Sequence, residues 1–218
     1  MTNFDISLDW LVLVPPSRTA RLAGADLARI IGLLREQEGL PQGAALLSDA
    51  LRDAPDEDVP IILLNSGQGR NFENGFSWRL GAKRLEIFGA SERGLCNGVY
   101  DFLSALGVIW PEPGREDLPP SPASGDGVYP VENSSAHRPS ETDPAKTRRF
   151  VMSGEIPPDE WEAALLWAVR GRMDEVVLPP QEGASFWAWI SGAARRRRKR
   201  LRRMAKDYAL LIGQPETR

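Results

Sequence analysis

The sequence predicts two kinds of fold in succession, an α+β domain over residues 1–115 and a run of β/α units over residues 146–218. Three observations lead to this prediction. In the first half, short apolar runs with the two-residue period of strands alternate with stretches that have the period of amphipathic helices. In the second half, strands and helices follow one another in turn, which is typical of parallel sheets. A stretch rich in proline and serine separates the two halves.

The chain begins with a predicted strand followed by a predicted helix. Apolar residues occupy every second position of residues 6–14, as in a strand with one buried face. Two prolines follow, and Ser17 or Thr19 can then cap a helix that runs to about Glu38. Gly39 ends this helix. Its apolar stripe recurs at spacings of three and four residues: Leu27, Ile30, Ile31 and Leu34.

A polar, acidic loop leads to the next predicted strands. Residues 59–64 are continuously apolar, as in a strand that is covered on both faces. Residues 76–80 and 85–87 alternate on either side of a short glycine-containing turn, which predicts a β-hairpin. Ser91 then caps a second helix that Gly107 ends, and a short strand follows. The complete order of this α+β domain is β-α-β-β-β-α-β.

Residues 116–145 have a different composition from the rest of the chain. Between Pro111 and Ala145 lie eight of the 18 prolines and five serines, and apolar residues show no periodicity there. Such a composition is typical of a linker that acts as a disordered tether. The alternative is an extended segment that wraps around the first domain.

Residues 146–218 are predicted to form consecutive β/α units with a parallel sheet, because strand and helix patterns alternate at the required spacing. The predicted strands are residues 149–153, 175–178 and 210–212, and the predicted helices are residues 159–170 and 193–209. In the first of these helices Trp161, Leu165 and Ala168 are expected to point inward.

The most specific motif lies between Leu85 and Pro111. A strand is followed by the G-x-x-x-R-G pattern of Gly89 to Gly94, then by Gly98-Val99-Tyr100, and finally by L-G-V-x-W at residues 106–110. This pattern resembles the domain that precedes the catalytic barrel in α-glucuronidases and β-N-acetylhexosaminidase-type glycoside hydrolases. Trp167 to Asp174 is similar to the W-x-x-R-N-R-M-N segment that opens the barrel of the same families, with Gly171 and Asp174 in place of both asparagines.

The resemblance implies that residues 146–218 are the start of a (β/α)₈ barrel and that the relatives hydrolyse glycosidic bonds with a pair of carboxylates. Residues 146–218 are far fewer than the about 250 of a complete barrel, so the segment is an incomplete α/β barrel. The families carry their carboxylates on later strands. We therefore expect no catalytic residue in this chain. The chain is expected to be either a truncated product or a subunit that needs a partner protein to complete the barrel.

Two residues are candidates for contact with a carbohydrate. The resemblance implies that an arginine early in the first barrel strand contacts the sugar, and Arg149 is the nearest match, with Arg148 as the alternative. Glu155 follows that strand, where barrel enzymes place their functional residues. Ser153, Gln181 and Glu182 lie in comparable positions after strands. The alternative interpretation is that the arginines are surface cations and that Glu155 stabilises a helix N-terminus.

A dense basic run from Arg195 to Arg203 carries eight cationic residues, although the chain as a whole has a net charge of −3. The run could bind nucleic acid or another anionic polymer through its charges, without reading bases, because no aromatic residues are interleaved with it. The alternative is the solvated face of a helix whose apolar side consists of Leu201, Met204, Ala205 and Tyr208.

Composition excludes several other classes. With one cysteine (Cys96) and one histidine (His137), the chain has neither a disulfide framework nor a His- or Cys-based zinc site, and no cofactor is expected. Cys96 is expected to be a small packed residue, a reactive thiol being the alternative. No apolar run spans a membrane and no basic signal region opens the chain, so a cytoplasmic protein is expected. Trp187 and Trp189 could stack on a sugar ring.

Overall fold

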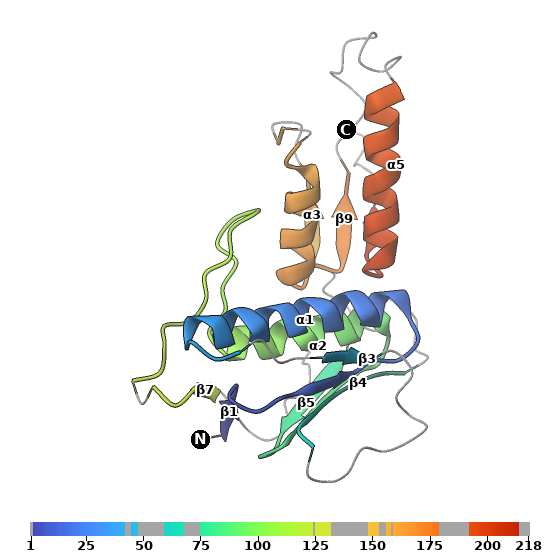
Figure 1. Cartoon of the computed structure of the whole chain (residues 1–218). Coiled ribbons are helices and arrows are strands. Elements are labelled where there is room, and N and C mark those ends of the chain that lie inside the picture. Colours follow the sequence, from blue (N-terminus) through green and yellow to red (C-terminus); the bar gives the residue numbers. More distant parts are fainter. Residues whose placement is uncertain are drawn as a thin grey trace.

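The computed structural model consists of two units that share a layer of helices (Figure 1). A five-stranded sheet lies on one side of helices α1 (Arg18–Gln37) and α2 (Glu92–Ala105), and a smaller β/α unit stands on their other side. The structure describes residues 2–41, 45–47, 59–67, 75–123, 125–131, 148–152, 156–157, 159–178 and 192–213.

The predicted first strand is wrong in its bounds, because the chain turns within it. Of residues 6–14 only β2 (Leu11–Leu13) is a strand, and a separate strand, β1 (Thr2–Asp5), precedes them. The carboxylate of Asp5 accepts hydrogen bonds from the backbone nitrogen and the hydroxyl of Ser7, at 2.8 and 2.6 Å, which is the local bond pattern that closes a turn. Ile6 and Trp10 are nevertheless buried, so the apolar alternation identified the core residues correctly.

The central sheet has the strand order β3-β2-β4-β6-β5 and is parallel except at β5. Its antiparallel pair is the predicted hairpin, which is confirmed. One strand was not predicted: β3 occupies only three residues within the region expected to be a polar loop, and pairs with β2. The remaining bounds are β3 (Ala45–Leu47), β4 (Ile61–Ser66), β5 (Phe76–Leu80) and β6 (Arg84–Gly89).

Both helices of the middle layer begin at the predicted caps. The hydroxyl of Ser17 accepts from the Ala20 nitrogen at 3.0 Å, and that of Ser91 accepts from the Gly94 nitrogen at 3.1 Å. Helix α2 ends in a turn at Gly107, whose φ of +94° lies in the left-handed region that favours glycine. Because α2 starts directly after β6, its first turn lies against the last residue of that strand.

Part of the segment predicted to be a linker packs against the first unit, so the described residues up to 131 correspond to the alternative prediction, an extended segment that wraps around the first domain. Strand β7 (Val128–Val131) pairs antiparallel with β1, and the hydroxyl of Tyr129 donates to Glu38 of the α1 C-cap at 2.9 Å. Of the predicted last strand only an isolated bridge between Ile109 and Asp117 exists. Residues 132–145 lie outside the described residues.

The second unit contains the predicted β/α units and parallel sheet, which are confirmed. Strand order is β10-β9-β8, with both neighbouring pairs parallel. The elements are β8 (Arg149–Val151), α3 (Trp161–Arg170), β9 (Glu175–Val177), α5 (Gly192–Asp207) and β10 (Leu211–Gly213). The ring of Phe150 packs edge-on against Trp167 of α3, with centroids 5.4 Å apart, so this face of the sheet carries the helices.

Polar contacts join the second unit to the middle layer. Arg93 of α2 is fully buried and donates to the backbone oxygens of Val169, at 3.3 Å, and Met173. Asp101, two turns further along α2, pairs with Arg172. The polar part of the junction thus consists of the buried cation Arg93 and the ion pair of Asp101 with Arg172. Arg93 and Asp101 lie on one side of α2.

We predict opposite effects of two glycine-to-alanine changes. A Cβ on Gly89 would lie 2.0 Å from the backbone nitrogen of Leu95, so Gly89→Ala should lower the free energy of unfolding by about 3 kcal/mol. Nothing lies within 4 Å of a Cβ on Gly32, which is inside α1, so Gly32→Ala should raise that free energy by roughly 0.5–1 kcal/mol.

Urea unfolding of the two variants measures both values, and Gly32→Ala controls for the loss of chain entropy that accompanies any such change. A Gly89→Ala variant as stable as wild type would show that α2 does not approach β6 this closely.

Candidate functional site

The carboxyl ends of the parallel strands β8 and β9 lie at the same edge of the second unit as the N-terminal ends of α3 and α5 (Figure 1). This follows from the connection, because each crossover helix begins where its strand ends. Ligand sites of α/β folds are typically found at this edge. Side chains from the N-terminal parts of α3 and α5 meet at this edge.

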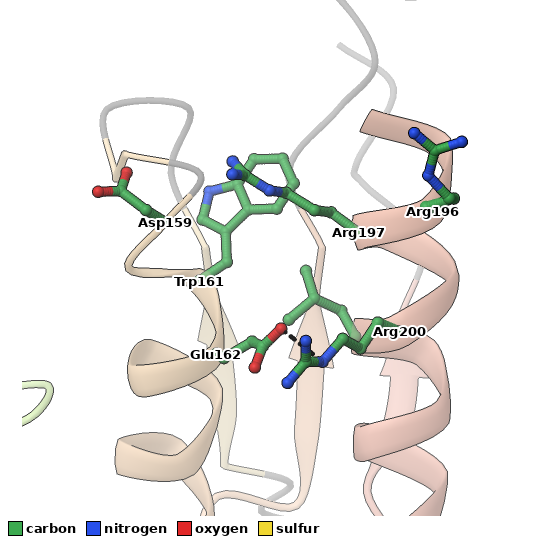
Figure 2. A pocket seen from close by; sticks show the side chains of 7 residues that line it. Asp159, Trp161, Glu162, Arg196, Arg197 and Arg200 are labelled. Atoms are coloured by element: carbon green, nitrogen blue, oxygen red, sulfur yellow. Dashed lines mark ion pairs between the residues drawn. The ribbon is translucent and has the colours of Figure 1, made fainter. Parts of the chain in front are cut away.

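A groove of about 450 Å³ separates the N-terminal parts of the two helices (Figure 2). Three of its residues come from the start of α3 and four from α5: Asp159, Trp161, Glu162, Arg196, Arg197, Arg200 and Leu201. The indole nitrogen of Trp161 donates to the backbone oxygen of Ile156 at 2.9 Å. This bond orients the half-buried ring and leaves its carbon surface as the apolar part of the groove wall.

The charges of the groove are unbalanced. Nε of Arg200 lies 2.8 Å from Oε1 of Glu162, the ion pair drawn in Figure 2. Both side chains are exposed to solvent, so this pair adds little to stability, on the order of 0–1 kcal/mol. This pair neutralises two of the charges in the lining. The remaining charged lining residues are the cations Arg196 and Arg197 and the anion Asp159. The groove is therefore positive.

This arrangement suits recognition of an anionic group beside an apolar ring. Arginine presents a planar fork of donors to carboxylate, sulfate or phosphate, and an aromatic ring offers a flat surface. Among its described lining residues there is no serine, cysteine or histidine, and one of the two carboxylates is already paired. The charges and the ring that are present suit binding.

A second groove, of about 800 Å³, lies along the opposite flank of α5, against the first turns of α1 and α2. Its carboxylates already have partners: Asp207 pairs with Arg18 at 2.8 Å, and Glu92 accepts from the hydroxyl of Thr19 at 3.0 Å. Four cations of α5 line it as well: Lys199, Arg202, Arg203 and Lys206. The basic run is thus a helix with positive grooves on both flanks.

The structure places Arg149 away from both grooves. It lies on β8, and its Nε is 2.6 Å from Oε2 of Glu175 on β9, with the side chain 43% exposed. The backbone nitrogen of the neighbouring Arg148 donates to the buried Asp174 at 2.8 Å. Contact of Arg149 with a sugar remains a prediction. The other predicted positions lie outside the described residues: Ser153, Glu155, Gln181, Glu182, Trp187, Trp189 and His137.

The groove between α3 and α5 was not among the sites predicted from the sequence. Trp161 was expected on the inward face of its helix, whereas its side chain is half-buried and lines the groove. A tryptophan between two carboxylates at a helix start is a signal that could have been noticed. Its pairing with the arginines depends on how α3 and α5 align, which periodicity does not reveal.

Cys96 is buried in α2 and does not form a reactive site. Burial raises the pKa of its thiol to about 11, an effect that the nearby Arg93 partly offsets. Among the described residues no group of three or more His, Cys, Asp or Glu side chains could hold a metal ion. None of the helices that the structure describes has the length and apolarity needed to cross a bilayer.

Several solved structures of glycoside hydrolases share this arrangement of elements. The chain is similar to Streptomyces plicatus N-acetyl-β-hexosaminidase in complex with Thio-NAglucal, with a TM-score of 0.60 and 15% identity over 98% of this chain and 42% of that one. For Flavobacterium johnsoniae chitobiase the TM-score is 0.61 and the identity 12%, over 98% and 32% of the two chains. A GH138 enzyme targeting pectin rhamnogalacturonan II has a TM-score of 0.52 at 13% identity, over 94% and 31%.

The chain therefore has a glycoside-hydrolase-like fold. It spans less than half the length of each of these solved chains, so their catalytic activities are not transferred with the fold. No protein-family model matches the sequence, and no curated protein matches it.

We predict that the buried thiol makes stability fall at alkaline pH. The pKa of Cys96 is raised in the folded state, so its contribution is complete below the ordinary thiol value of about 9 and is lost as the pH rises towards 11. Between pH 9 and 10 the free energy of unfolding should fall by about 1 kcal/mol through this group.

Urea titrations at both pH values measure this fall, and Cys96→Ala should reduce it. The buried phenol of Tyr208, whose pKa is raised to about 12, adds to the fall because the unfolded phenol titrates near its ordinary value of 10, so the part due to Cys96 is the difference between wild type and Cys96→Ala. Equal slopes in wild type and Cys96→Ala would contradict the assignment.

Proposed function

We propose that this chain is the N-terminal portion of a glycoside-hydrolase-like protein of carbohydrate metabolism. It supplies an accessory α+β domain followed by the first β/α units of a barrel, and it is non-catalytic by itself. The observation that supports this most directly is the match of 98% of the chain to only 42% of a hexosaminidase. The motif at residues 85–111 supports a relationship to α-glucuronidases as well.

The sheet of the second unit exposes apolar side chains on its two edge strands. Phe150 points towards α3, so Arg149 and Val151 point to the other face. On that face Val151 is 60% exposed and Leu211, which is in register with Glu175, is 39% exposed, whereas Val177 of the central strand is buried. In a closed barrel this face is the packed interior. We propose that a protein partner supplies further parallel strands that cover it.

The first test is a hydrolysis assay with aryl N-acetylglucosaminides and aryl glucuronides. We expect no turnover by the purified chain, because the proposed acid and base carboxylates belong to strands beyond β10. Turnover that co-elutes with the chain in size-exclusion chromatography would overturn the non-catalytic part of the proposal.

The second test measures self-association by sedimentation velocity over a concentration series. Exposed apolar side chains on two open edge strands should drive association, so the average mass of wild type should rise above 24.1 kDa. Val151→Lys should lower that mass. Ile109→Lys is the matched control, because Ile109 is 55% exposed but lies on the first unit.

A wild-type chain that stays at 24.1 kDa at every concentration would argue against a sheet face that needs cover. An equal effect of Ile109→Lys would assign the association to general surface hydrophobicity.

A further inference from the structure

Helix α5 concentrates positive charge that the folded chain does not neutralise. Its apolar side is used for packing, since Leu201 and Ala205 are fully buried. Nine of the twelve residues from Arg195 to Lys206 are cationic. Among the described residues, the structure gives an ion pair to only one of these cations, Arg200. The outward surface of α5 therefore consists of cations that lack carboxylate partners in the described part of the chain.

The crowding of these cations is visible at Arg198. Its Nε is buried without a hydrogen-bond partner in the described part of the chain, and burial together with the charge of Arg202 lowers the pKa of its guanidinium. A bound anion would relieve this repulsion. Charge complementarity thus indicates an anionic ligand for the surface of α5.

The two flanks of the helix differ in chemistry. The flank towards α1 offers charge alone, because its lining contains no aromatic residue. The flank towards α3 adds Trp161, whose ring is held by the bond to Ile156. Arg197 extends from that same flank towards Trp161, whereas the guanidinium of Arg196 points away from α3 (Figure 2). Of the two grooves, this one combines a flat apolar surface with an arginine that reaches towards it.

That combination selects among anionic ligands. A membrane surface requires an exposed apolar stripe on the helix, and here the stripe is buried. A single-stranded nucleic acid requires successive stacking residues, and the groove has one aromatic ring. A sugar ring with a carboxylate presents an apolar face beside an anion, which matches one indole beside an arginine.

We propose that the groove between α3 and α5 binds acidic polysaccharide, with the uronate carboxylate held by Arg197 and the sugar ring on Trp161. The volume of about 450 Å³ lies within the range of small-ligand sites and admits a short stretch of the polymer. The proposal rests on the charges and ring of the groove and does not depend on the barrel relationship.

Calorimetric titration of the full chain with an oligogalacturonate tests the proposal, with the methyl-esterified oligomer as the uncharged probe. We expect binding of the first and none of the second. Arg196→Gln/Arg197→Gln should weaken binding about tenfold or more, since the charge-assisted contact of Arg197 and the neighbouring charge of Arg196 are lost. The matched control Arg202→Gln/Arg203→Gln removes the same charge from the same helix and should weaken binding less than threefold.

The aromatic contribution separates sugar binding from electrostatic attraction. Trp161→Leu should weaken binding about fivefold, while Trp161→Phe should keep most of the affinity because the flat ring remains. Thermal unfolding of both variants checks that the loss of the bond to Ile156 has not unfolded α3.

Duplex DNA over a salt series is the competing probe. Failure of the oligogalacturonate to bind would overturn the proposal. An equal loss of oligogalacturonate affinity in the two double-arginine variants, together with tighter binding of DNA, would also overturn the proposal. It would assign α5 to the binding of nucleic acid. Neither result would affect the hydrolysis and association tests of the proposed barrel relationship.

Discussion

The buried guanidinium of Arg93 is the constraint on which the arrangement of the two units depends. Removal of a cation from water is expensive, and burial lowers the pKa of this group. The compensation comes from the second unit: the carbonyls of Val169 and Met173 accept hydrogen bonds from its guanidinium, and the charge of Asp174 favours the cation. Without the turn after α3, Arg93 would lose both of these acceptors.

The same constraint explains the most specific motif of the sequence. Gly89 allows the backbone of α2 to start against the end of β6, and this position directs Arg93, four residues later, away from the sheet and towards α3. Asp101 follows Arg93 at a spacing of eight residues on the same side of the helix and pairs with Arg172. The motif that resembles glycoside hydrolases is thus the joint between the units. Its residues join the two units to each other.

Local patterns were sufficient to predict the hairpin, both capped helices and the parallel β/α units, because each depends on residues close in sequence. They failed where an element or a groove depends on a segment that is distant in the sequence. Strand β7 forms because β1 offers it an unpaired edge, and nothing in the Pro- and Ser-rich composition of its surroundings reveals that edge. The groove at Trp161 likewise requires two helices whose contributing residues are about 35 positions apart to be aligned. Of the proposed site residues only Arg149 could be placed, and it lies elsewhere.

The two surfaces proposed for the second unit do not compete. Because successive residues of a strand point to opposite faces, Val151 lies on the face of β8 opposite to Phe150, which packs against α3. A partner that covers Val151 would leave the helix surface open, since the groove lies between the helices (Figure 2). The cations of α5 would then remain exposed in the completed assembly.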